Sequence, residues 1–145
     1  MLRPSRSRGG LTLALVGYGA VLALVLLAPT SDVQSALVAH VDRLVVRVGV
    51  PADLATQARA EFVCNALILM PVSALGSLRW PRTTWRDWTA YAFLVAGVVE
   101  LAQGLLLPER TATFADVAAN TLGGLGGAAA VAFVRRWPSP RRSRR

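Results

Sequence analysis

The chain has 145 residues, and its composition is too apolar for an ordinary soluble domain of that length. Hydrophobic residues make up 54% of the sequence and the mean hydropathy is +0.46, values typical of a membrane protein. The net charge is +8, and all 16 basic residues are arginines. Because these arginines flank long apolar runs, attraction to anionic lipid headgroups accounts for them, and we expect no nucleic-acid partner.

The chain has one cysteine, Cys64, and one histidine, His40. A single cysteine excludes an internal disulfide framework and any multi-cysteine metal site. We therefore expect no metal and no cofactor, and we interpret Cys64 as a buried inert thiol.

Four apolar stretches predict an all-α polytopic membrane protein with four transmembrane helices. They cover residues 11–28, 62–78, 89–107 and 114–134. Each is close to the roughly 20 residues that a helix needs to cross a bilayer. Pro71 interrupts the second stretch and predicts a kink, because proline lacks a backbone donor. The first stretch has the basic prefix of a signal peptide, but Leu26 and Pro29 fit a cleavage site poorly, and we expect a retained helix.

The placement of the arginines predicts the orientation. Twelve of the 16 lie before the first stretch, between the second and third, or after the fourth. Both termini are therefore expected in the cytoplasm by the positive-inside rule. The four tryptophans fall at the same ends of the spans, at the depth of the lipid headgroups: Trp80, Trp85, Trp88 and Trp137.

This orientation divides the chain into five segments. A basic cytoplasmic N-terminus (1–10) precedes the first span, and an extracytoplasmic loop (29–61) leads to a core of three spans (62–134). The arginine-rich segment 135–145 is expected to be a disordered cytoplasmic tail that lies on anionic lipid of the inner leaflet.

The extracytoplasmic loop is expected to contain an amphipathic helix. Apolar residues recur at helical spacing from Val33 to Val48, opposite polar residues such as Asp42 and Arg47. Such a helix can lie on the outer membrane surface or pack as a lid across the outer ends of the bundle. His40 lies in this segment, and we expect it to be solvated.

Few polar residues lie inside the predicted spans, and they gather in the outer half. Glu100 and Gln103 share one face of the third span, and Asp116 and Asn120 share one face of the fourth. With a rise of 1.5 Å per residue, Glu100 lies roughly 10 Å and Asn120 roughly 9 Å below the outer surface. Asn65 lies in the same half of the second span. Because polar groups are costly in hydrocarbon, these residues are candidates for a functional site.

Arg110 lies in the short connection between the third and fourth spans, which makes these spans antiparallel neighbours. It can reach either Glu100 or Asp116, and its guanidinium can also bind a phosphate or carboxylate ligand. Two interpretations stay open. The charged groups hold the two helices of the hairpin together, or they form a polar pocket for the headgroup of an amphiphile.

The fourth span carries a row of small residues at four-residue spacing: Ala115, Ala119, Gly123 and Gly127. Such a row lets the backbone of another helix approach closely. Packing within the chain and formation of a homo-oligomer both fit this pattern.

In their order and spacing, the polar residues resemble the VanZ-like family, whose C-terminal half carries the pattern E-x-x-Q, R, D-x-x-x-N-T-x-G. The matching positions are Glu100, Gln103, Arg110, Asp116, Asn120 and Gly123, followed by Gly127. Asn65 and Pro71 are similar to the family's N-x-x-L-F-x-P-x-G segment, in which Leu69 and Ser73 replace the Phe and the final Gly. The resemblance covers roughly residues 62–134.

The resemblance implies a bacterial cell-membrane protein of four helices, in a family whose founding member is linked to low-level resistance to teicoplanin. That antibiotic carries a lipid tail and acts at the outer face of the membrane. Our leading expectation is therefore a non-enzymatic protein that binds or shields an amphiphilic ligand, a lipoglycopeptide antibiotic or a cell-wall lipid, at the outer leaflet. A small oligomeric transporter or flippase is one alternative. A membrane enzyme acting on a lipid-linked substrate is the other, although the sequence places no nucleophile beside a base.

Overall fold

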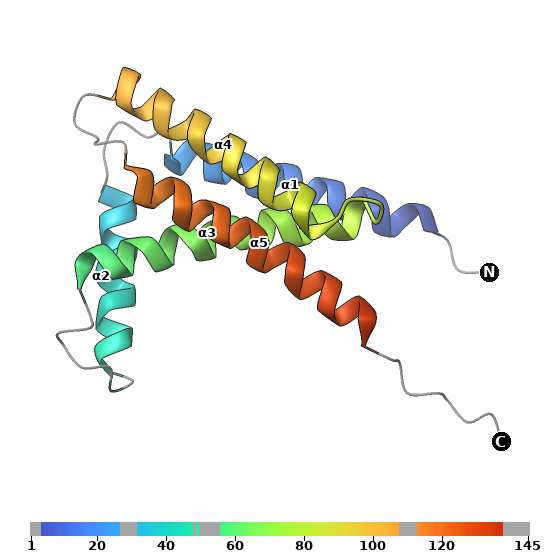
Figure 1. Ribbon diagram of the computed structural model, residues 1–145, viewed down its shortest axis with the longest axis horizontal. Helices are drawn as coiled ribbons and strands as arrows, with labels where there is room; N and C mark the ends of the chain where they lie inside the picture. Colours follow the sequence, from blue (N-terminus) through green and yellow to red (C-terminus); the bar gives the residue numbers. More distant parts are fainter. Residues whose placement is uncertain (1–3, 27–31, 48, 50–55, 108–112, 138–145) are drawn as a thin grey trace.

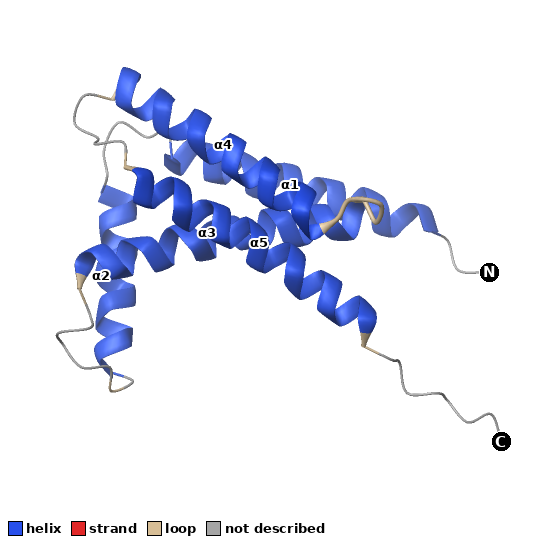
Figure 2. Cartoon of the chain, in the orientation of Figure 1, coloured by secondary structure: helices blue, strands red, loops and turns tan. Residues whose placement is uncertain are grey.

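The computed structural model describes residues 4–26, 32–47, 49, 56–107 and 113–137. All regular structure in these ranges is helical (Figure 2), which confirms the prediction of an all-α fold. The helices are α1 (Pro4–Leu26), α2 (Asp32–Arg47), α3 (Gln57–Arg79), α4 (Trp85–Leu106) and α5 (Phe114–Arg136). All except α2 are long and apolar enough to cross a membrane, as the sequence predicts.

Each of the three helices after α2 is preceded by a capping threonine. Thr56, Thr84 and Thr113 have extended backbone, and each hydroxyl accepts a hydrogen bond from the N–H of the residue three positions later. Because the first turns of α3 and α4 contain polar residues, hydropathy alone places their starts too late. The helices begin at Gln57 and Trp85 instead of residues 62 and 89.

The centre of the bundle is α5, which packs between α3 and α4. A Cβ atom at Gly123 or Gly127 would overlap the backbone of α3, and one at Gly124 would overlap Ala92 of α4. The row of small residues therefore serves packing within this chain. Ser73, at the position where the family pattern has glycine, is buried and lies against Gly127.

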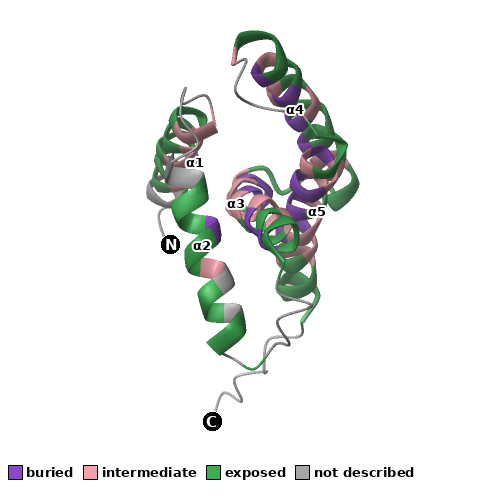
Figure 3. Cartoon of the chain, turned by 90° about the vertical axis from the view of Figure 1, so that its left-hand side faces the viewer, coloured by how far each residue is buried: buried purple, intermediate pink, exposed green. Residues whose placement is uncertain are grey.

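On the other side of α3 lies α1, the least enclosed of the four long helices. No residue of its apolar span is buried, and Figure 3 shows α1 and α2 standing to one side of the other helices. Arg79 Nε donates a hydrogen bond to Thr12 Oγ1 (2.8 Å), and the Tyr18 hydroxyl donates to the Ile68 carbonyl (2.7 Å). Ile68 lies in the turn before Pro71, where α3 lacks one backbone donor but continues as a helix.

One end of the bundle is crossed by α2, which runs at a steep angle to the long helices (Figure 1). Val38 packs against Ala60 and Cys64 of α3 in a small apolar cluster. Leu37 and Leu44 remain 41% and 46% exposed. The amphipathic helix therefore docks on the bundle through Val38, and other apolar residues of α2 remain exposed.

The first residues of α1 and the last residues of α5 both lie at the opposite end of the bundle, apart from each other (Figure 1). We call this the tail end, and the end crossed by α2 the α2 end. Trp80, Trp85 and Trp137 are exposed at the tail end. Trp88 differs, because its ring occupies the space beside Gly76 of α3 and is half-buried. This tryptophan packs between α3 and α4.

Candidate functional site

Polar side chains of three helices meet at the α2 end of the bundle. We call the following residues the polar cluster: Asn65, Glu100, Gln103, Thr113, Asp116 and Asn120. Glu100, Gln103 and Asn120 are buried, with 9%, 6% and 7% of their surface exposed, and Asn65 and Asp116 are half-buried. The structure thus brings five of the six predicted site residues to one end of the bundle and adds Thr113.

Thr113, the cap of α5, connects the two carboxylates of the cluster. Its backbone N–H donates to Glu100 Oε2 (3.0 Å), and its hydroxyl donates to Asp116 Oδ2 (2.6 Å). The Asp116 N–H in turn donates to Thr113 Oγ1 (3.1 Å). In an ordinary capping box the acidic residue three positions after the cap would accept the cap's own N–H. Here Glu100 of α4 takes that role.

Because Glu100 accepts the Thr113 N–H, one carboxylate oxygen of Asp116 is available to a third helix. Asn65 Nδ2 of α3 donates to Asp116 Oδ1 at 2.5 Å. The start of α4 provides the contrast, since Thr84 N–H donates to its own Asp87 in a complete capping box. At the start of α5, the Thr113 N–H and the Asp116 carboxylate bond to other helices instead. These bonds join the ends of α3, α4 and α5.

Sequence reasoning missed Thr113, although the signal was present. A threonine followed three residues later by an acid, directly before an apolar run, is the pattern of a capped helix start. Applied to Thr113 and Asp116, this pattern predicts that the threonine lies beside the carboxylate. It does not predict that Glu100 accepts the N–H, because that depends on the position of α4.

Gln103 shares a helix face with Glu100, as predicted, but contacts a different neighbour. Its Nε2 donates to the Leu26 carbonyl at 2.6 Å, which joins the last turns of α4 and α1. The buried amide therefore satisfies a carbonyl at the end of a helix, where the last carbonyls have no partner within the helix.

Asn120 differs from the other members of the cluster. It lies one turn beyond Asp116 on α5 and is 7% exposed, yet its side chain makes no hydrogen bond within the part of the chain that the structure describes. The contact of Gly124 with Ala92 sets the antiparallel register of α4 and α5 and places Asn120 near the level of Ala96. A buried amide without partners costs about 1–3 kcal/mol, so Asn120 is where the cluster gains most from a bound polar group.

Both carboxylates of the cluster lie at the N-terminus of α5. The helix dipole and the unpaired N–H groups of a first turn favour negative charge there. Arg110, which the sequence predicts to pair with Glu100 or Asp116, lies outside the described residues, and its pairing stays a prediction.

The remaining candidates lie away from this chemistry. Cys64 is buried beneath α2, as expected, and His40 is exposed on α2. Within the described ranges, no three His, Cys, Asp or Glu side chains gather as a metal site. The amides and carboxylates of the cluster can donate and accept hydrogen bonds.

Comparison with known proteins extends the resemblance seen in the motifs. The family model described as VanZ/LLP1 matches residues 11–135, which cover most of the chain. The match includes α1 and the segment before α3, where the motif comparison finds nothing. No curated protein and no solved structure matches the chain significantly. With four membrane-spanning helices and this match, the chain is a multi-pass membrane protein and belongs to the VanZ/LLP1 family.

Proposed function

We propose that this protein binds or shields an amphiphilic ligand at the outer leaflet of a bacterial cell membrane, through the polar cluster. The ligand class is a lipoglycopeptide antibiotic or a cell-wall lipid, and binding contributes to low-level teicoplanin resistance. Family membership supports the link to resistance. The arginines and tryptophans of the tail end support an orientation with both termini in the cytoplasm and the α2 end outside.

The unpartnered amide of Asn120 is the observation that carries this proposal. Four members of the cluster each hydrogen-bond to another part of the chain, and a purely structural role accounts for them: Asn65, Asp116, Glu100 and Gln103. Asn120 is as buried as Glu100 and Gln103 but is left without a bond among the described residues. A ligand headgroup that reaches between α4 and α5 would supply the missing partner, and the paired residues would hold the helices around it.

The experiment compares antibiotic susceptibility of a sensitive Gram-positive host that expresses the wild type, Asn120→Leu or Thr121→Val at matched membrane abundance. Thr121 is the control because its hydroxyl donates only within its own helix, to the Val117 carbonyl (2.7 Å). We expect the wild type and Thr121→Val to lower susceptibility to teicoplanin, and Asn120→Leu to lose this protection. Vancomycin, which lacks the lipid tail, should show no difference.

Two results count against the proposal. If Asn120→Leu protects as well as the wild type, the amide is not a ligand contact. If no variant changes teicoplanin susceptibility, this member of the family does not act on that antibiotic, and the same three proteins should next be tested for retention of cell-wall lipid. The transporter and the lipid-active enzyme stay predictions from the sequence.

A further inference from the structure

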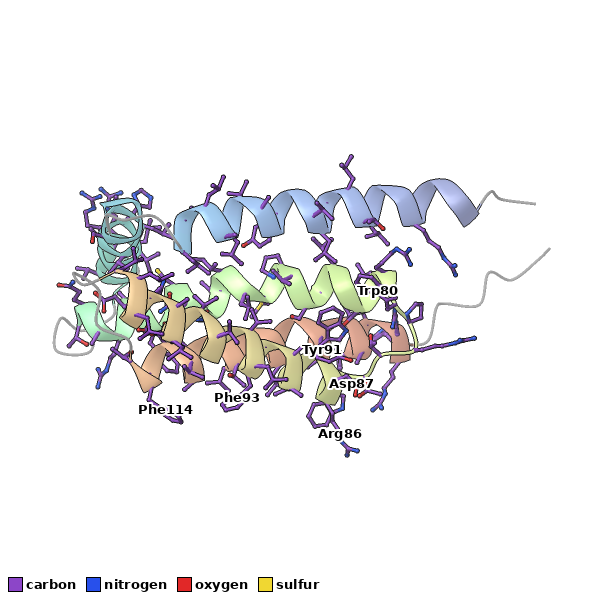
Figure 4. The ribbon with its side chains drawn as sticks, turned by 90° about the horizontal axis from the view of Figure 1, so that it is seen from above. Trp80, Arg86, Asp87, Tyr91, Phe93 and Phe114 are labelled. Carbon is purple, nitrogen blue, oxygen red and sulfur yellow. The ribbon has the colours of Figure 1, made fainter. Side chains whose placement is uncertain are left out.

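A cavity of about 350 Å³ lies at the tail end, far from the polar cluster. It is open to one side and is bounded by the end of α3, the start of α4 and the last turns of α5. Its inner wall consists of small side chains, among them Ser77, Ala128 and Ala132. Figure 4 shows Arg86 and Asp87 at this end of the bundle and Phe114 at the other. The volume is within the range of small-ligand sites.

Three arginines from two helices line the cavity: Arg86, Arg135 and Arg136. Arg135 donates one N–H to the Ser77 carbonyl at 2.8 Å, which fixes its guanidinium against α3. The guanidinium carbon of Arg86 lies 5.1 Å from the centroid of the Trp85 ring, a stacking contact that leaves its N–H groups available. Arg136 makes no hydrogen bond to any described residue. The cavity therefore offers several unused cationic donors.

Among the described residues, no carboxylate forms an ion pair with these arginines. Asp87 is the acid nearest in sequence, but its carboxylate accepts from the Thr84 N–H (2.7 Å) and the Thr84 hydroxyl (2.9 Å). The backbone N–H groups of Trp85 and Arg86, in the first turn of α4, have no acceptor within the described ranges. Backbone donors at a helix start and arginines on the opposite wall are the groups that bind phosphate.

We propose that this cavity binds the phosphate of an anionic glycerophospholipid from the leaflet that surrounds the tail end. Exposed Trp85 lines the cavity, and exposed Trp80 and Trp137 lie at the same end of the bundle, which is typical of the headgroup level. Val131 and Ala132 provide apolar wall beside the arginines, which suits the glycerol and upper acyl chain. Free phosphate would gain nothing from that wall or from a position at headgroup depth. This site is independent of the proposed function at the α2 end.

The test measures lipid retention on the purified full chain by native mass spectrometry. Protein in mild detergent is incubated with phosphatidylglycerol or phosphatidylcholine, with and without inorganic phosphate. The double variant Arg86→Gln/Arg136→Gln removes two arginines of the cavity. The matched control, Arg82→Gln/Arg8→Gln, removes the same charge from exposed residues that do not line it. We expect the wild type to retain phosphatidylglycerol over phosphatidylcholine, and the cavity variant to retain it about tenfold less than the control.

The outcomes separate a specific site from general surface charge. Equal losses in the cavity variant and the control, or no loss in either, would overturn the proposal. Displacement of phosphatidylglycerol by millimolar inorganic phosphate would assign the cavity to free phosphate and overturn the lipid. If the cavity variant does not fold, Ala132→Phe fills the cavity without changing charge. Loss of phosphatidylglycerol in this variant supports the site, and unchanged retention contradicts it.

Discussion

The two ends of the bundle use polar residues in opposite ways. At the α2 end, polar side chains are buried and most are paired across helices, as Asn65 is with Asp116. At the tail end, arginines such as Arg86 and Arg136 are exposed and surround a cavity.

Helix spacing explains the difference. Gly123 brings α5 into backbone contact with α3 beside the polar cluster. At the tail end the ring of Trp88 occupies the space between α3 and α4, and the end of α5 runs away from both (Figure 1). Where the helices approach closely, most polar groups bond to one another and Asn120 is the exception, whereas the arginines at the tail end keep N–H groups available for a ligand.

Replacing Gly123 with valine should have the largest effect, because it pushes α5 away from α3 beside the polar cluster. The new side chain would overlap the backbone of Ala66, and we expect the free energy of unfolding to fall by about 3 kcal/mol. Unfolding by sodium dodecyl sulfate in mixed micelles measures this change. Gly97→Val on α4 is the control, because nothing lies within 4 Å of a Cβ atom there. An equal loss in both variants would mean that the close contact is not the cause.

Asp116→Ala should have the next largest effect. It removes the acceptor of the Asn65 amide and of the Thr113 hydroxyl, and we expect a loss of about 2 kcal/mol in the free energy of unfolding. Glu61→Ala removes an exposed carboxylate from α3 and should change stability little. If Asp116→Ala is as stable as Glu61→Ala, the bonds between helices at the α2 end do not hold the bundle together.

Gln103→Leu should cost less, about 0.6 kcal/mol, because hydrogen bonds between membrane helices contribute little on average. Its effect should be local, since the lost bond joins the end of α4 to Leu26 of α1. Spin labels at exposed Leu24 and Leu101, in a Cys64→Ala background, should report a broader distance distribution between α1 and α4. Thr89→Val, which removes a bond within α4, should leave that distribution unchanged.

Asn120→Leu is the one variant that should cause no loss of stability, and the sign of its effect separates ligand binding from a purely structural role. Because the amide has no partner among the described residues, replacing it with an apolar side chain should leave the free energy of unfolding unchanged or raise it by up to about 1 kcal/mol. The same unfolding assay measures this change. A loss comparable to that of Asp116→Ala would make Asn120 a structural residue and remove the main support for the proposed ligand site.

Much of the fold follows from the sequence because hydrocarbon imposes strong constraints. The predicted start of the fourth span at Phe114 agrees with α5, since Thr113 caps the helix where the apolar run begins. The grouping of Glu100 with Asp116 follows from the antiparallel hairpin and the rise of a helix. The start of α4 at Trp85 was not predicted, because the first turn of that helix is polar and is set by the capping box at Thr84.

Other features depend on positions in space that a single sequence does not specify. The partner of Gln103 is a backbone carbonyl of α1, 77 residues away in the chain. The cavity at the tail end depends on the angle at which α5 leaves α4, and no motif of Arg86, Arg135 and Arg136 predicts it. The sequence likewise leaves open whether α2 packs on the bundle, and the contact of Val38 with Ala60 shows that it does.

Equilibrium binding of teicoplanin to the purified protein in lipid nanodiscs tests the central claim most directly. The account predicts saturable binding by the wild type and by Thr121→Val, and at least a tenfold weaker affinity for Asn120→Leu, which corresponds to about 1.4 kcal/mol. Vancomycin should not bind. Equal binding by Asn120→Leu and the wild type, at equal stability, would contradict a ligand site at the buried amide.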